Sequence, residues 1–158
     1  MTFPFSYNKQ KVIRALRYHF IWQKEIRIML IVIILFDIIS AVLYYTGKIQ
    51  PQPFMLGSVI WFFFIISIWF FLPNNIYRKS ATFKEKYIIT FKNSGILLET
   101  ERGGAEWQWY DIIKYAESPD FFHLYFSSKS FFLVPKDEIS SEMISTLRSL
   151  LKNNIKTF

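Results

Sequence analysis

Two long apolar runs dominate the pattern of hydrophobic and polar positions along the chain. Residues 28–45 contain one charged side chain, Asp37, and residues 54–72 contain none. At about 1.5 Å per helical residue, the runs cover roughly 27–29 Å, close to the ~30 Å hydrocarbon thickness of a bilayer. A cleaved signal peptide would account for only one apolar run. The pattern therefore predicts two membrane-spanning helices joined by the short loop 46–53.

Prolines mark the ends expected for the second helix. Pro51 and Pro53 lie in the loop that precedes it. Pro73 follows the second apolar run and is itself followed by Asn74 and Asn75. Because proline lacks an N–H and clashes with the preceding turn, Pro73, Asn74 and Asn75 are expected to end the second helix.

After residue 80 the apolar positions alternate with polar ones, which is the period of a half-buried β-strand. The adjacent Gly103 and Gly104 indicate a hairpin turn at residues 102–105, since glycine tolerates the positive φ angles of tight turns. Pro135 is expected to stop the last strand. The predicted strands are residues 87–91, 95–101, 106–110, 112–117, 121–126 and 131–134.

A helical period of three to four residues occurs near both ends of the chain. Ser140 is placed to cap a C-terminal helix whose apolar stripe would close the β domain. Near the start, residues 2–7 are expected to be extended, and Asn8 to cap a helix that begins at Lys9. The C-terminal stripe comprises Ile139, Met143, Leu147, Leu150, Leu151 and Ile155.

Together these elements predict an α+β membrane protein, with a two-helix transmembrane hairpin and a small antiparallel β domain closed by a C-terminal helix. We expect an N-terminal strand and basic amphipathic helix in residues 1–27. The hairpin occupies residues 28–72, and the cytosolic β domain occupies residues 80–158.

The net charge of +7 lies entirely in the first half of the chain. Residues 1–79 contain nine Lys or Arg and two acids, whereas residues 80–158 contain ten of each. Because positive flanks stay cytoplasmic, both termini are expected in the cytosol. The excess is expected to face anionic lipid headgroups and not nucleic acid, since it clusters beside the apolar runs. The headgroup-facing residues predicted are Lys11, Arg14, Arg17, Lys24, Arg27, Arg78 and Lys79.

The N-terminal basic helix has two interpretations. Its cations lie on one face and its apolar residues on another, so it could lie in the headgroup layer. Alternatively, the helix packs on the cytosolic domain. The sequence favours neither.

Asp37 lies near the middle of the first apolar run, where an acid costs roughly 2.5–3.5 kcal/mol. One interpretation is a polar contact with a partner protein or a second copy. Another is a hydrogen bond to Ser40 on the same helix, or to Ser58 or Ser67 on the second. Ion handling is a third, although two helices are too few to enclose a path.

Aromatic residues are abundant in the predicted strands. Trp107 and Trp109 are expected on one face of their strand, and Phe121 and Phe131 each begin a pair of consecutive aromatics. Packing in the domain core is the favoured interpretation. Exposed members of this set would form a partner surface: Trp107, Trp109, Phe121 and Phe131.

The residues show no catalytic or metal-binding constellation. The chain has no cysteine, and His19 and His123 have no neighbour at a metal-ligand spacing. No cofactor is expected. Serines 127, 128 and 130 lack the Gly-x-Ser-x-Gly context of a hydrolase nucleophile.

Several short motifs recur in a defined order in the second half. They are Tyr-Ile-Ile-Thr-Phe at 87–91, Ser-Gly-Ile at 94–96, Glu-Trp-Gln-Trp-Tyr-Asp-Ile-Ile-Lys at 106–114, Glu117, Phe-Phe-His-Leu-Tyr at 121–125 and Phe-Phe-Leu-Val-Pro-Lys at 131–136. In this order they resemble the C-terminal domain of the YcxB-like family of bacterial membrane proteins. The resemblance implies a β domain of pleckstrin-homology-like type in the bacterial inner membrane, and it implies no catalytic residue.

We therefore expect a non-enzymatic inner-membrane adaptor or regulatory subunit that binds a protein partner or forms an oligomer. The alternative is an immunity-type protein that protects the cell from a membrane-acting toxin. An enzyme acting on lipid ranks last, because no acid–base or metal constellation supports it.

Overall fold

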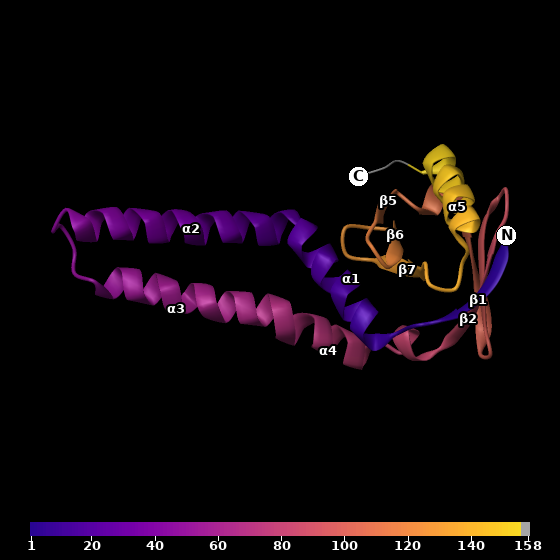
Figure 1. Cartoon of the computed structure of the whole chain (residues 1–158), viewed down its shortest axis with the longest axis horizontal. Helices are drawn as coiled ribbons and strands as arrows, with labels where there is room; N and C mark the ends of the chain where they lie inside the picture. Colours follow the sequence, from indigo (N-terminus) through magenta and orange to yellow (C-terminus); the bar gives the residue numbers. More distant parts are fainter. Residues whose placement is uncertain (156–158) are drawn as a thin grey trace. The chain divides into compact units, whose positions relative to one another are not determined.

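The computed structural model describes residues 1–155, which form two compact units. One unit comprises Met1–Ala15 and the described residues from Ser80 onward. The other comprises Leu16–Lys79. The first contains the strands, and the second contains the long apolar helices (Figure 1).

The β unit contains a four-stranded and a three-stranded antiparallel sheet within the described residues. The first has the order β1 (Thr2–Ser6), β2 (Lys86–Phe91), β3 (Gly95–Thr100) and β4 (Gly103–Gln108). The second has the order β5 (Lys114–Glu117), β6 (Phe121–Tyr125) and β7 (Phe131–Pro135). Helix α5 (Ser141–Asn154) follows, and Ser140 Oγ accepts the Met143 N–H as its N-cap. The α+β class and the closing helix are thus as predicted.

Strand β1 comes from the start of the chain, yet it pairs with β2. Phe3 lies opposite Ile89, and Phe5 lies opposite Tyr87. The 79 residues from 7 to 85 are therefore an insertion between two neighbouring strands. The sequence predicted an extended segment here but did not foresee this pairing, so the division at residue 27 separated a strand from its own sheet.

The core lies between the sheets and α5. Phe3 and Phe5 are each 4% exposed, and Leu147 and Leu151 of α5 are fully buried against the same cluster. Tyr7 follows β1, and its hydroxyl donates a 2.7 Å hydrogen bond to Leu133 O. Burial raises the pKa of Tyr7 well above its ordinary value of 10.0. The N-terminal strand is thus an integral part of the core.

Several strand ends differ from the sequence prediction. Gly103 and Gly104, predicted to form the hairpin turn, begin β4, and the turn lies at Glu101 and Arg102. The return strand ends at Gln108, because Asp111 Oδ2 accepts the Gln108 N–H at 2.8 Å and the chain turns into a short 3₁₀-helix, Trp109–Asp111. β7 ends at Pro135, as predicted, and Pro135 is itself the last strand residue, paired with Phe121.

The helical unit contains α2 (Lys24–Tyr45), α3 (Gln52–Ile66), a π-helical turn η1 (Ser67–Phe71) and α4 (Leu72–Lys79). Helix α1 (Lys9–Trp22) leads into it from β1. The prediction that residues 73–75 end the second helix was wrong, because helical structure continues to Lys79. Pro73 is the second residue of α4, and proline is tolerated in the first turn of a helix.

Two of these helical stretches are long and apolar enough to cross a membrane: Lys24–Tyr45 and Gln52–Lys79. Only 6% and 11% of their most apolar windows are buried within the chain. A core helix of a soluble protein would be mostly buried, so the apolar surface of both helices is available to lipid or to another protein.

Candidate functional site

Asp37 on α2 faces Gly57 on α3. A Cβ atom at Gly57 would collide with Asp37 Oδ1 and would lie 2.8 Å from the Phe36 ring, so only glycine is accommodated without movement. Asp37 Oδ1 is buried and, among the residues that the structure describes, has no hydrogen-bond partner. A buried carboxyl oxygen without a hydrogen-bond partner is energetically costly, which makes this the chemically most unusual contact of the hairpin.

The serines predicted to bind Asp37 do not satisfy its buried Oδ1. Ser58 Oγ donates to Phe54 O at 3.0 Å, within its own helix. Ser40 is buried, and Ser67 begins the π-helical turn. None of the three supplies a hydrogen bond to Asp37 Oδ1 in the described part of the chain. Contact with a partner protein or a second copy stays a prediction.

The basic residues at the start of α1 pair with the β unit. Lys11 Nζ lies 2.6 Å from Asp137 Oδ2, and Arg14 Nη2 lies 3.3 Å from Asp120 Oδ2. Val12, on the same half of the helix, is fully buried. For this half of α1, the contacts favour the alternative in which the helix packs on the β domain.

Arg17 binds the backbone at the π-helical turn. Its Nε donates a 2.8 Å hydrogen bond to Trp69 O, and its guanidinium lies 4.9 Å from the Trp69 ring centroid. In an α-helix this carbonyl would accept the N–H four residues later, but that residue is Pro73, which has none. Arg17 therefore satisfies a carbonyl that proline leaves open, a role that the charge pattern alone did not indicate.

The remaining predicted headgroup residues flank the apolar helices. Lys24 begins α2, and the Arg27 guanidinium lies 5.9 Å from the Trp22 ring centroid. Arg78 and Lys79 form the last turn of α4 and are exposed.

Two of the four aromatic residues proposed as partner surface are in the core. Trp109 is 8% exposed, and its Nε1 donates to Asn93 O at 2.9 Å. Phe121 is 1% exposed. Trp107 and Phe131 are partly buried, and the Trp107 ring packs against Phe126 and Phe132. The partner-surface prediction was therefore wrong for Trp109 and Phe121, because the 3₁₀ turn and the β6 register direct both inward.

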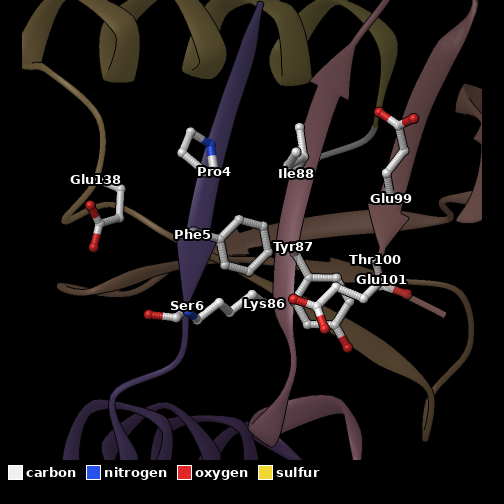
Figure 2. A pocket seen from close by; sticks show the side chains of 10 residues that line it. All are labelled: Pro4, Phe5, Ser6, Lys86, Tyr87, Ile88, Glu99, Thr100, Glu101 and Glu138. Atoms are coloured by element: carbon white, nitrogen blue, oxygen red, sulfur yellow. The ribbon is translucent and has the colours of Figure 1, made fainter. Parts of the chain in front are cut away.

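The outer face of the four-stranded sheet carries a groove of about 660 Å³ (Figure 2). Pro4 of β1 and Ile88 of β2 form an apolar strip, and Ile88 is 47% exposed. Three carboxylates and one amine surround the strip: Glu99, Glu101, Glu138 and Lys86. The groove is not evident from the sequence, since it depends on the pairing of β1 with β2.

β1 is an edge strand of this sheet, and Pro4 lies in it at a position whose backbone faces away from β2. Phe91 N donates to Met1 O at 2.8 Å, so residues 1, 3 and 5 bond to β2 and residues 2, 4 and 6 face the other side. Pro4 offers no N–H there, which disfavours pairing with another strand. The face of the sheet, and not its edge, is the surface suited to a partner.

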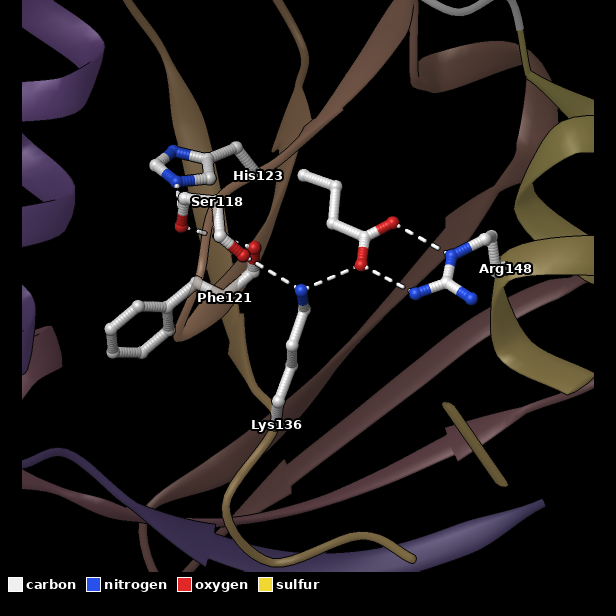
Figure 3. Close-up of polar contacts among 6 residues, drawn as sticks. Ser118, Phe121, His123, Lys136 and Arg148 are labelled. Carbon is white, nitrogen blue, oxygen red and sulfur yellow. Dashed lines mark hydrogen bonds and ion pairs between the residues drawn. The ribbon is translucent and has the colours of Figure 1, made fainter. Parts of the chain in front are cut away.

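A polar cluster fastens α5 to the three-stranded sheet (Figure 3). Arg148 donates to both oxygens of Glu117, at 2.9 and 2.7 Å, and Lys136 Nζ lies 2.6 Å from Glu117 Oε1. The hydrogen bonds from Arg148, with those from Lys136, lower the pKa of Glu117 to about 2, although partial burial opposes the shift. This arrangement is a structural clamp.

Beside the clamp, His123 Nε2 lies 2.9 Å from Ser118 Oγ, and both residues are buried. A Ser–His pair can act in nucleophilic catalysis. Here Ser118 Oγ donates its proton to Phe121 O at 3.2 Å, and the fully buried imidazole stacks on the rings of Tyr125 and Phe131. Both side chains are buried, so the pair is inaccessible to substrate and serves packing.

Metal binding finds no support in residues 1–155, which contain no group of three or more His, Asp or Glu placed to hold an ion.

Residues 91–151 match the family of YcxB-like proteins, which confirms the resemblance seen in the sequence motifs. No curated protein and no solved structure matches the chain.

Proposed function

We propose that the protein is a non-enzymatic adaptor or regulatory subunit of the bacterial inner membrane. Helices α2 and α3–α4 form its two-span anchor with both termini in the cytosol, in agreement with the positive flanks and the exposed apolar surface. The β unit is of pleckstrin-homology-like type, since it combines sheets of four and three antiparallel strands with a closing C-terminal helix.

The observation that carries the proposal is the groove on the outer sheet face. An exposed apolar strip at Pro4 and Ile88, bordered by three carboxylates, is complementary to a protein segment that presents apolar and basic side chains. The connectivity of the chain also supports the proposal. The segment that forms the anchor is inserted between β1 and β2, the two strands that form the floor of the groove.

The test is partner capture from native membranes in mild detergent, using the full chain with a photo-crosslinking residue at Ile88. Wild type is expected to yield one stoichiometric protein partner. Charge reversal in the groove, Glu99→Lys with Glu101→Lys, is expected to abolish this crosslink. The matched control is Glu142→Lys, an exposed carboxylate on α5 outside the groove.

A crosslinked partner that survives the double reversal, or the absence of any stoichiometric partner, would contradict the adaptor role. Capture of a membrane-acting toxin would assign the same surface to the alternative immunity function. Release of the protein by alkaline carbonate would contradict the anchor itself.

A further inference from the structure

The junction between η1 and α4 contains a groove of about 520 Å³ with a graded lining. Phe70, Phe71 and Leu72 line it toward the apolar end of the helix, where Ser67 also contributes to the lining. Asn74, Asn75 and Arg78 line it toward the polar end. The lining therefore changes from aromatic to amide to guanidinium along about two turns of helix.

The π-helical turn creates this arrangement. Leu72 N–H bonds to Ser67 O, five residues earlier, so the turn holds more residues than an α-helical turn. Phe70 belongs to the π-helical turn, and α4 after it has the ordinary spacing, with Asn74 and Arg78 four residues apart; the three residues line the groove in one row. Asn74 Nδ2 donates to Phe70 O at 2.7 Å and fixes the middle of the row.

The electrostatic environment favours an anion. No Asp or Glu occurs between Asp37 and Glu85, so the segment that forms the groove contributes no carboxylate to its polar end. Arg78 supplies a planar fork of N–H donors, the geometry that matches phosphate oxygens. The apolar end has no such donors, and Phe71 is 70% exposed there.

We propose that this groove binds one anionic glycerophospholipid of the cytosolic leaflet. Its phosphate lies against Arg78 and Asn75, and its acyl chains run along Phe70 and Phe71. The inference rests on the membrane insertion proposed above, which puts the end of the second apolar run at headgroup depth. It goes beyond a general attraction of basic flanks to acidic membranes, because it assigns a single lipid to a defined site.

The test is native mass spectrometry of the full chain, extracted in mild detergent and reconstituted in nanodiscs of phosphatidylglycerol and phosphatidylcholine. Wild type is expected to retain one phosphatidylglycerol per chain in preference to phosphatidylcholine. Arg78→Gln is expected to weaken this retention about tenfold, the value of a lost charge-assisted hydrogen bond. Asn75→Asp, which places a carboxylate in the groove, is expected to do the same.

Lys79→Gln is the matched control, since it removes the same charge one residue away and outside the groove lining. Equal losses in Arg78→Gln and Lys79→Gln would show diffuse attraction and overturn the site. Equal retention of both lipids by wild type would overturn it too. Displacement of the lipid by soluble glycerol phosphate would assign the site to a free phosphate instead of a lipid.

Carbonate extraction of the same variants separates this proposal from the proposed function. All of them are expected to stay in the membrane, because none changes the apolar runs. If wild type is released, the anchor fails. If it stays but shows no lipid selectivity, only the lipid site fails.

Discussion

The hydrogen bond from Arg17 to Trp69 O gives a prediction that pairwise substitution tests directly. Arg17→Ala removes a charged donor from a carbonyl that Pro73 cannot satisfy. A hydrogen bond from a charged group contributes about 1.5–3 kcal/mol, and stacking on an aromatic ring contributes about 0.5–1 kcal/mol at an exposed site. Arg17 is only partly buried, so we expect a loss of about 2 kcal/mol in the free energy of unfolding of the helical unit.

In a Pro73→Ala background the cost of Arg17→Ala is expected to fall. Alanine at position 73 supplies the N–H that an α-helix directs to Trp69 O, so only the ring contact is lost, about 0.5 kcal/mol. The coupling energy between residues 17 and 73 is therefore expected to be at least ~1 kcal/mol. Arg17→Lys should behave more like Arg17→Ala than like wild type, because lysine lacks the planar donor fork.

The assay is reversible unfolding of wild type, the two single variants and the double variant by SDS in mixed micelles, followed by far-ultraviolet circular dichroism. Arg27→Ala is the control. Arg27 also lies over an aromatic ring, that of Trp22, but it is not placed beside a carbonyl that a proline leaves without its N–H donor. An equal cost of Arg17→Ala in the wild-type and the Pro73→Ala backgrounds would refute the reasoning.

Three further predictions concern other contacts. Gly57→Ala should lower the unfolding free energy of the hairpin by about 1–3 kcal/mol in the same micelle assay. In an Asp37→Ala background the same substitution should cost less, and an equal loss of unfolding free energy in both backgrounds would contradict the contact between Gly57 and Asp37. Phe5→Ala should lower the unfolding free energy of the β unit in the full chain by about 3–5 kcal/mol in urea, whereas the outward-facing Ser6→Ala should change little. Glu117→Gln should lower the unfolding free energy of the β unit by about 1 kcal/mol, a value that allows for solvent screening of the partly exposed pair. Because the folded pKa of Glu117 is lowered to about 2, this difference should be present above about pH 5 and shrink as the pH falls toward 2; a constant difference would contradict the clamp.

Local patterns predicted the local elements well. The alternation of apolar residues in β2 and β3, the Ser140 cap and the stripe of α5 each depend on neighbours within a few positions, and each is confirmed. The 3₁₀ turn after Gln108 was missed because it depends on a hydrogen bond from the Gln108 N–H to the Asp111 carboxylate, which the pattern of apolar positions does not indicate.

The candidate sites were harder to predict, since each combines residues that are distant in sequence. The charges of Lys11 and Arg14 indicated lipid headgroups, but the structure supplies Asp137 and Asp120 as partners. Arg17 was placed in the same class, although its partner is a backbone carbonyl, which no side-chain pattern reveals. The groove at Ile88 requires strands from both ends of the chain.

The pairing of β1 with β2 shows how such a distant contact can be favourable. Closing a flexible loop of 79 residues costs about 4 kcal/mol beyond a constant. Complete burial of Phe3 and Phe5 contributes roughly 3–6 kcal/mol, and the strand ladder adds to it. Packing of α2 against α3, which brings distant parts of the insertion together, reduces the closure cost further, since the effective loop becomes shorter. The helical hairpin and the sheet therefore stabilise each other through chain connectivity, so a substitution that loosens the hairpin should also weaken the pairing of β1 with β2.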